Sequence, residues 1–163
     1  MKAKYEINGV AKTITFDFAS EATIRNGFSL SLMEKVFQLV LAESGASANV
    51  YTNRPKSLAT NVSDFIVSSM QGSLEDMATY GECTMNIALF AKDAAGFKNG
   101  VKLSVVQDAV FAGLPFSISV TDNNDVLKEE YLIDQYPDIV GDAPDDYGFH
   151  CRMILLRTTI KVI

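Results

Sequence analysis

The chain has 163 residues, of which 48% are apolar, and a formal net charge of −6 with a pI near 4.7. We expect one domain over residues 1–163, because this length suffices for a single core that buries about two thirds of the unfolded surface. The excess of acids argues against a surface that binds nucleic acid or anionic membranes through bulk electrostatics. Composition alone indicates a soluble globular α+β domain.

Neither export nor membrane insertion is expected. The start, Met1 to Glu6, is polar and lacks the apolar core of a secretory signal. The most apolar run, Val36 to Ala42, is interrupted by Gln38 and is far shorter than the roughly 20 residues that span a membrane. Cys83 and Cys151 lie in alternating apolar runs, so we expect two reduced, buried thiols, which suits synthesis in a cytoplasm.

The first elements are a hairpin and a helix. Asn8-Gly9 predicts a tight turn between two strands over residues 2–18, because this pair readily adopts positive φ angles. The Ser-x-x-Glu spacing at residues 31–34 is typical of a capping box, and helical periodicity follows it until Gly45 offers a left-handed stop. These features predict a helix over residues 32–44.

Extended segments follow this helix. Residues 49–52 look extended, and Arg54-Pro55 ends them because a residue before proline avoids helical dihedrals. Residues 64–70 are rich in β-formers, and the polar residues 71–81 are predicted to be a connection. Strict alternation then predicts a strand over residues 82–91 with one wet face.

The second half contains another helix and further strands. Asn99-Gly100 opens a helical pattern that Leu114-Pro115 closes. Residues 116–120 are predicted to form a strand that turns at 122–125, whereas periodicity leaves 126–131 open between strand and helix. The density of Ile, Leu, Thr and Val predicts a long final strand over 149–162.

Together these elements predict an α+β fold, a mostly antiparallel sheet that carries two helices and is preceded by an N-terminal β-hairpin. Both the first helix and the strand at 82–91 have one apolar stripe that needs a partner. We therefore expect these stripes to pack together, the helix contributing Val36, Leu39 and Val40 and the strand contributing Met85, Ile87 and Leu89.

Charge is concentrated in residues 122–146. This segment has nine acids and one base, Lys128, for a net charge of −8, while the rest of the chain carries +2. Its second half also holds Pro137, Gly141 and Pro144, which predicts a long exposed loop of the kind that carries binding surfaces. The nine acids are Asp122, Asp125, Glu129, Glu130, Asp134, Asp138, Asp142, Asp145 and Asp146.

We expect this segment to be an exposed acidic interaction surface. Close exposed acids repel one another, so removing several of them is expected to leave stability equal or higher. The residues expected to carry the surface are Asp138, Asp142, Asp145 and Asp146.

Signatures of catalysis and of cofactor binding are weak. His150 is the one histidine, and a structural role in the final strand is favoured. Zinc would need two ligands beyond His150 and a cysteine, and Asp122 to Asp125 lacks the ligand pattern of a calcium loop. The adjacent Asp145 and Asp146 share one environment, which suits general acid and base roles poorly. With no phosphate-binding or nucleophile-elbow motif, we expect no enzyme, cofactor or metal.

The order of elements resembles that of the tail-terminator, or tail-completion, proteins of tailed bacteriophages. The residues that carry this resemblance are the helix at 32–44, Asn49-Val50-Tyr51 before Arg54-Pro55, the strand Asp64 to Ser68, Cys83 to Phe90 followed by Ala91-Lys92-Asp93, the helix Gly100 to Leu114 and the late strand. The resemblance is one of pattern, because this family shares no invariant motif. The hairpin at 2–18 and the long acidic segment depart from the pattern.

The resemblance implies a structural role without catalysis. Small α/β protomers of this family form a ring, commonly a hexamer, that caps the tail tube and meets neck or head-completion proteins. It implies a virion protein made in the bacterial host cytoplasm, with itself and these neighbours as partners, indirect contact with passing DNA and no membrane. The alternatives are another head-tail connector or neck ring protein, an adaptor of another bacterial assembly, or an enzyme of unrecognised family that uses residues 122–146.

Overall fold

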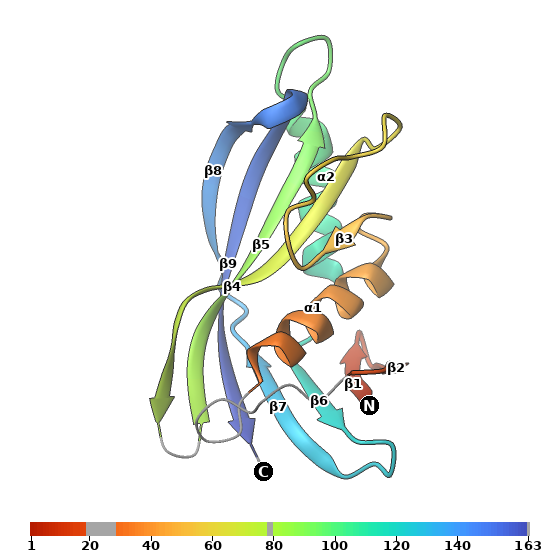
Figure 1. Ribbon diagram of the computed structural model, residues 1–163, viewed down its shortest axis with the longest axis vertical. Coiled ribbons are helices and arrows are strands. Elements are labelled where there is room, and N and C mark those ends of the chain that lie inside the picture. Colours follow the sequence, from red (N-terminus) through yellow and green to blue (C-terminus); the bar gives the residue numbers. More distant parts are fainter. Residues whose placement is uncertain (19–28, 78–79, 163) are drawn as a thin grey trace.

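The computed structural model describes residues 1–18, 29–77 and 80–162 (Figure 1). Two helices and nine strands make up this part of the chain. The helices are α1 (Leu30–Ser44) and α2 (Gly100–Gly113). The strands are β1 (Lys2–Ile7), β2 (Val10–Thr15), β3 (Val50–Tyr51), β4 (Asp64–Met77), β5 (Tyr80–Lys92), β6 (Ser117–Thr121), β7 (Leu127–Ile133), β8 (Asp138–Asp145) and β9 (Phe149–Val162).

All nine strands belong to one curled sheet. Its order is β2-β1-β6-β7-β9-β5-β4-β3, and β8 pairs with β9 beside this path. The long strands β4, β5 and β9 run through most of the molecule (Figure 1). The predicted α+β class, with two helices on a mostly antiparallel sheet, is confirmed. The sheet is nevertheless mixed, because β3 pairs with β4 in parallel.

The N-terminal hairpin is present and joins the sheet. The turn residues Asn8 and Gly9 have φ angles of 50° and 77°, which is the conformation that the Asn-Gly pair predicts. β1 pairs with β2 on one side and with β6 on the other. The hairpin therefore extends the sheet at one edge.

Helix α1 begins two residues earlier than predicted. The Ser29 hydroxyl, 3.3 Å from the Leu32 nitrogen, accepts the capping hydrogen bond. The predicted capping box is wrong, because Glu34 instead accepts a hydrogen bond from the Met70 backbone N–H at 2.9 Å and so ties the helix to β4. The predicted stop is confirmed, since Gly45 has a φ of 72°.

The polar connection predicted over residues 71–81 is wrong. β4 continues to Met77 and β5 begins at Tyr80, so the two strands form one long antiparallel pair. The register shifts between Gln71 and Glu75. A strand ladder is held by backbone hydrogen bonds, which polar residues make as well as apolar ones, and composition alone therefore misplaced this boundary.

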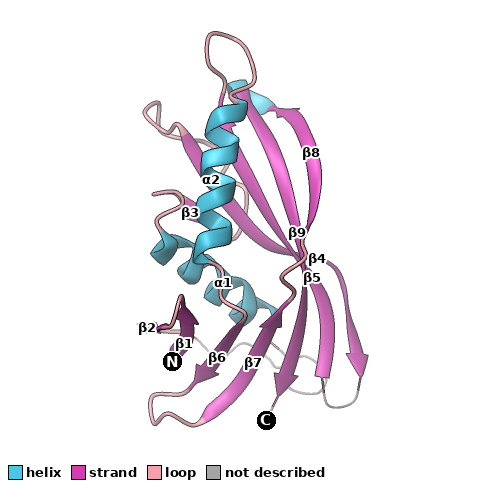
Figure 2. Cartoon of the chain, turned by 180° about the vertical axis from the view of Figure 1, so that it is seen from behind, coloured by secondary structure: helices cyan, strands magenta, loops and turns pink. Residues whose placement is uncertain are grey.

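The predicted packing of α1 on the β5 face of the sheet is confirmed in part. Five of the six predicted residues are buried in the same core cluster, whereas Leu39 is only partly buried at its margin. Helix α1 lies closest to β3, β4 and α2, and α2 is the helix that lies against β5. Periodicity missed Met33, Phe37 and Leu41, which are fully buried. Helix α2 covers the same face of the sheet through Leu103, Val106 and Val110 (Figure 2).

The opposite face of the sheet holds a second, smaller cluster. Side chains alternate along a strand, so the neighbours of the helix-facing residues point to this other face. The cluster consists of Phe65, Val67, Ala88, Phe90 and Phe149. The segment after β3 packs onto it through Leu58 and Val62. The sheet is thus covered on both faces at this end of the molecule.

The acid-rich segment contains a strand where a loop was predicted. Of residues 126–131, which periodicity left open, all but Val126 belong to β7. The predicted long exposed loop is wrong, because residues 138–145 form β8 along the upper half of β9 (Figure 1). The register shifts between Val140 and Ala143, around Gly141 and Asp142. Pro144 is paired with His150 at this sheet edge, where strands tolerate proline.

Candidate functional site

The acids at the β6–β7 turn are neutralised within the chain. The Asp122 carboxylate accepts hydrogen bonds from the backbone N–H groups of Asn124 and Val126, which lowers its pKa. Asp125 lies 2.9 Å from the Lys2 ammonium and 2.7 Å from that of Lys4, and these contacts hold its pKa at about 2. This end of the segment therefore anchors the N-terminal strand.

Glu129 is buried in β7 rather than exposed. Its carboxylate accepts hydrogen bonds from the Tyr131 hydroxyl at 2.5 Å and from the Ser29 backbone N–H at 3.1 Å. Burial raises the pKa of Glu129. This acid thus ties β7 to the start of α1 and contributes nothing to an external surface.

Asp142, one of the four predicted surface residues, is also buried. Its side chain is 8% exposed, and the Arg152 guanidinium donates to both carboxylate oxygens at 2.6 and 2.9 Å. The Lys98 ammonium lies 3.1 Å away. Arg152, followed by Lys98, lowers the pKa of Asp142 to about 2.

Asp145 forms a second internal ion pair on the other face of the sheet. Its Oδ2 lies 2.6 Å from Nη2 of Arg54. The Arg54 guanidinium also lies over the rings of Phe65 and Phe90, with centroid distances of 5.4 and 5.1 Å. Arg54 therefore holds the segment after β3 against the sheet through charge and cation–π contact.

The other two predicted surface residues, Asp138 and Asp146, are exposed. Neither forms an ion pair with a residue whose side chain the structure describes. They lie at opposite ends of β8, Asp138 as its first residue and Asp146 in the short 3-10 turn that follows it. The acidic interaction surface stays a prediction, and its exposed unpaired part is restricted to these two residues and Asp134.

His150 is held by an acid near the end of β5. Its Nδ1 lies 2.6 Å from Oδ1 of Asp93, which itself donates its backbone N–H to Gly148. The expectation of two buried thiols is confirmed for Cys83 and wrong for Cys151, which is only partly buried. Burial raises the pKa of Cys83 and of Cys151 to about 11. Among the described residues, no three His, Cys, Asp or Glu side chains are placed to hold a metal ion.

The large exposed apolar residues on α2 and in nearby connections, here called the apolar band, were missed by sequence analysis. Val101 and Val105 lie one turn apart on α2 and are 79% and 57% exposed. Phe97 precedes the helix and Phe116 follows it, at 77% and 72% exposure. Tyr136, at 88%, lies in the connection between β7 and β8.

The signal for this band is present in the helix sequence. Helix α2 carries Val101 and Val105 on its outer face, beside the exposed polar residues Ser104 and Asp108, in addition to its apolar inner face. In the single chain, only its inner face is covered. Large exposed apolar side chains grouped in this way are characteristic of interaction surfaces.

Comparisons with known proteins do not assign a family. No protein-family model matches the chain, and no curated protein matches it. In the described ranges, no helix is both long and apolar enough to cross a membrane.

Proposed function

We propose that this chain is a structural subunit of a tailed bacteriophage that assembles into a closed ring of identical copies, at the tail end or in the head-tail neck. It performs no catalysis in this role. The observation that carries the proposal is the exposed apolar band around Val101 and Val105. A second copy of the chain covers it.

Two further features support a self-assembling role. The helix, short strand, two long strands and second helix occur in the order that prompted the resemblance to tail-terminator proteins. In addition, the ion pairs of Asp125, Asp142 and Asp145 are internal, so the charge of the acidic segment stiffens the subunit. A ring subunit needs a rigid body with two different contact surfaces.

The proposal is tested by measuring the mass of the assembled protein by light scattering, alone and with isolated tail tubes. We expect a closed oligomer for the wild type and a monomer for Val101→Asn/Val105→Asn. Val126→Asn is the matched control, because Val126 is an exposed valine on the β6–β7 turn. Wild type that stays monomeric under both conditions, or a double variant that assembles normally, contradicts the proposal.

A further inference from the structure

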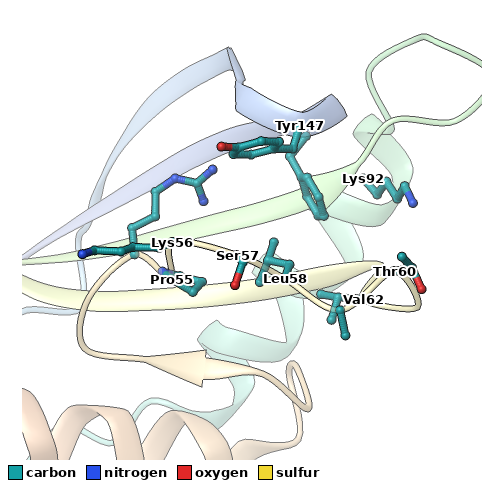
Figure 3. A pocket seen from close by; sticks show the side chains of 11 residues that line it. Pro55, Lys56, Ser57, Leu58, Thr60, Val62, Lys92 and Tyr147 are labelled. Atoms are coloured by element: carbon teal, nitrogen blue, oxygen red, sulfur yellow. The ribbon is translucent and has the colours of Figure 1, made fainter.

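A pocket of about 340 Å³ opens on the face of the sheet opposite the helices. It lies between the segment after β3 and the turn that precedes β9, with Tyr147 on one side and Pro55, Leu58 and Val62 on the other (Figure 3). Leu58, Val62 and Phe149, which line it, belong to the smaller apolar cluster. The pocket therefore has a mixed lining, in which these apolar side chains offer a surface for an aromatic or aliphatic side chain.

The rim of this pocket is cationic. Lys56 and Lys92 are exposed and form no ion pair with any residue whose side chain the structure describes. Arg54 uses Nη2 for Asp145, while its Nη1 is buried without a hydrogen bond to a described residue. Because Asp145 balances Arg54, the unpaired cations at the rim are Lys56 and Lys92, and the exposed acid Asp146 precedes Tyr147 in the neighbouring turn. The chemistry of the pocket fits an apolar group flanked by acids.

Tyr147 occupies an unusual backbone conformation at the pocket. Its φ and ψ angles are 63° and 27°, and Gly148 has a φ of 73°. The left-handed region is unfavourable for a bulky residue, and such positions cluster at ligand sites. The Tyr147 side chain is exposed and lines the pocket (Figure 3). This turn thus presents an aromatic ring to whatever enters.

The chain itself carries a segment of complementary chemistry. Tyr136 protrudes between Asp134 and Asp138, and neither acid has a described ion-pair partner. The segment is ordered by its own hydrogen bonds, since Asp134 accepts from the Tyr136 backbone N–H at 2.9 Å and Gln135 donates to the Ile133 carbonyl at 3.0 Å. An ordered tyrosine loses little conformational freedom on binding.

The pocket and this acidic segment lie on opposite faces of the sheet. Asp134 and Pro137 border a hollow that Phe111 and Leu114 also line, and those two residues pack on the helix-side core. The pocket is lined by the cluster of the other face. The two surfaces of one chain therefore cannot meet, whereas those of successive copies can. A contact between two different surfaces of identical chains is the head-to-tail type that closes rings.

We infer that Tyr136 of one copy enters the Arg54–Tyr147 pocket of the next copy, with Asp134 and Asp138 against Lys56 and Lys92. This inference rests on the proposed ring and names the contact that forms it. The same repeated contact places the apolar band of each copy towards its neighbour.

The first test uses a peptide of residues 132–139 and the full chain with the substitution Tyr136→Ala. This substitution keeps the chain's own segment from competing with the peptide. Calorimetry is expected to show saturable binding of this peptide. The affinity is expected to fall about tenfold or more when the peptide has Ala in place of Tyr136, and likewise when the chain carries Lys56→Glu/Lys92→Glu. Equal binding of both peptides would make the pocket an unspecific anion site and overturn the inference. So would the absence of saturable binding, or binding of inorganic phosphate that the peptide does not displace.

The second test mixes two assembly-defective variants. Tyr136→Ala/Asp138→Lys lacks the segment, and Lys56→Glu/Lys92→Glu lacks the pocket. Each alone is expected to stay monomeric, whereas their mixture is expected to stop at a one-to-one dimer, because only one productive contact exists between them. Lys12→Glu/Lys35→Glu is the matched control, since both lysines lie outside the two surfaces.

The outcomes separate this inference from the proposed function. If the wild type forms a ring and both variants form the same ring, the contact is wrong and the proposed function stands. If the wild type forms no ring even on tail tubes, the proposed function fails. The peptide measurement then still decides whether the pocket accepts this segment.

Discussion

Asp142 in β8 and Arg152 in β9 form a bidentate ion pair, with Nε 2.6 Å from Oδ1 and Nη2 2.9 Å from Oδ2. Arg152 also donates to Ser104 and Gln107 of α2, at 3.3 and 3.0 Å. One arginine therefore joins the edge strand, the central strand and the covering helix. This contact explains why an acid-rich, proline-containing segment is held as a strand.

The first prediction concerns Asp142. Asp142→Asn is expected to lower the free energy of unfolding by about 2 kcal/mol or more, because it leaves Arg152 largely buried and without its carboxylate. The folded pKa of about 2 lies below the ordinary value of 3.8. The stabilisation is thus complete above about pH 4 and lost as the pH falls towards 2. Urea unfolding of the wild type and of Asp142→Asn at pH 7 and pH 2.5 checks this. The same difference in the free energy of unfolding between the two proteins at both pH values would contradict the prediction.

The second prediction is the contrast with the exposed acids. Asp138→Asn/Asp146→Asn is expected to change the free energy of unfolding by less than about 0.5 kcal/mol, since neither side chain has a described ionic partner. Of the four acids predicted to carry the surface, these two are the ones for which the expectation of unchanged or higher stability holds. If this double variant had a thermal midpoint as low as that of Asp142→Asn, exposure would not distinguish Asp138 and Asp146 from Asp142.

The third prediction is that the buried and the partly buried sides of α1 contribute differently to the free energy of unfolding. Phe37 is fully buried, and Phe37→Ala is expected to cost about 3 to 5 kcal/mol. Leu39 is only partly buried, so Leu39→Ala is expected to cost less than about 2 kcal/mol, the lower end of the range for buried leucines. Denaturant midpoints with matched slopes measure both. A larger loss for Leu39→Ala would reverse the assignment of the helix face.

The fourth prediction tests the close approach of the two helices. A Cβ atom at Gly113 would clash with the Ser44 side chain at the end of α1. Gly113→Ala is therefore expected to destabilise the fold by about 1 to 3 kcal/mol. Ser44→Gly added to it is expected to recover part of this loss, which a double-mutant cycle measures. If the effects of the two substitutions were simply additive, Gly113 and Ser44 would not be in contact, which would contradict the close approach of the helices.

A fifth prediction follows from the two thiols. Burial raises the pKa of Cys83 and Cys151 to about 11, so thiolate is scarce at neutral pH. Labelling with a thiol reagent at pH 7.5 is expected to be much slower in the native protein than in urea. Rapid labelling of Cys83 in the native state would indicate that the core opens readily.

Local patterns predicted most of the fold because each has a local physical cause. The Asn8-Gly9 turn, the Gly45 stop and the alternation over residues 82–87 depend on dihedral preferences and on one buried face. The predicted wet face of this strand is wrong for residues 88–91, because Ala88 and Phe90 are buried in the second cluster. The β4–β5 extension and β8 depend on backbone pairing with distant strands, which composition does not reveal. Glu34 illustrates the same limit, since its partner Met70 lies on another element.

The candidate site was less predictable than the fold. The acidic segment was found by counting charges, but pairing with Arg54, Arg152 and Lys98 is set by tertiary structure, and it removes Asp142 and Asp145 from the predicted surface. The pocket residues come from three separate parts of the chain, so no local motif marks them. Only Val101 and Val105 of α2 carried a signal in the sequence, since they place large apolar residues on the outer face of the helix.

The central claim is that this chain works as a ring of identical subunits in a phage particle. Cryo-electron microscopy of the particle, with the chain located by its own density, tests it most directly. The account predicts a closed symmetric ring at the tail end or neck, in which the Tyr136 segment of each copy faces the Arg54–Tyr147 pocket of its neighbour. Density for the chain outside any symmetric ring would contradict the account.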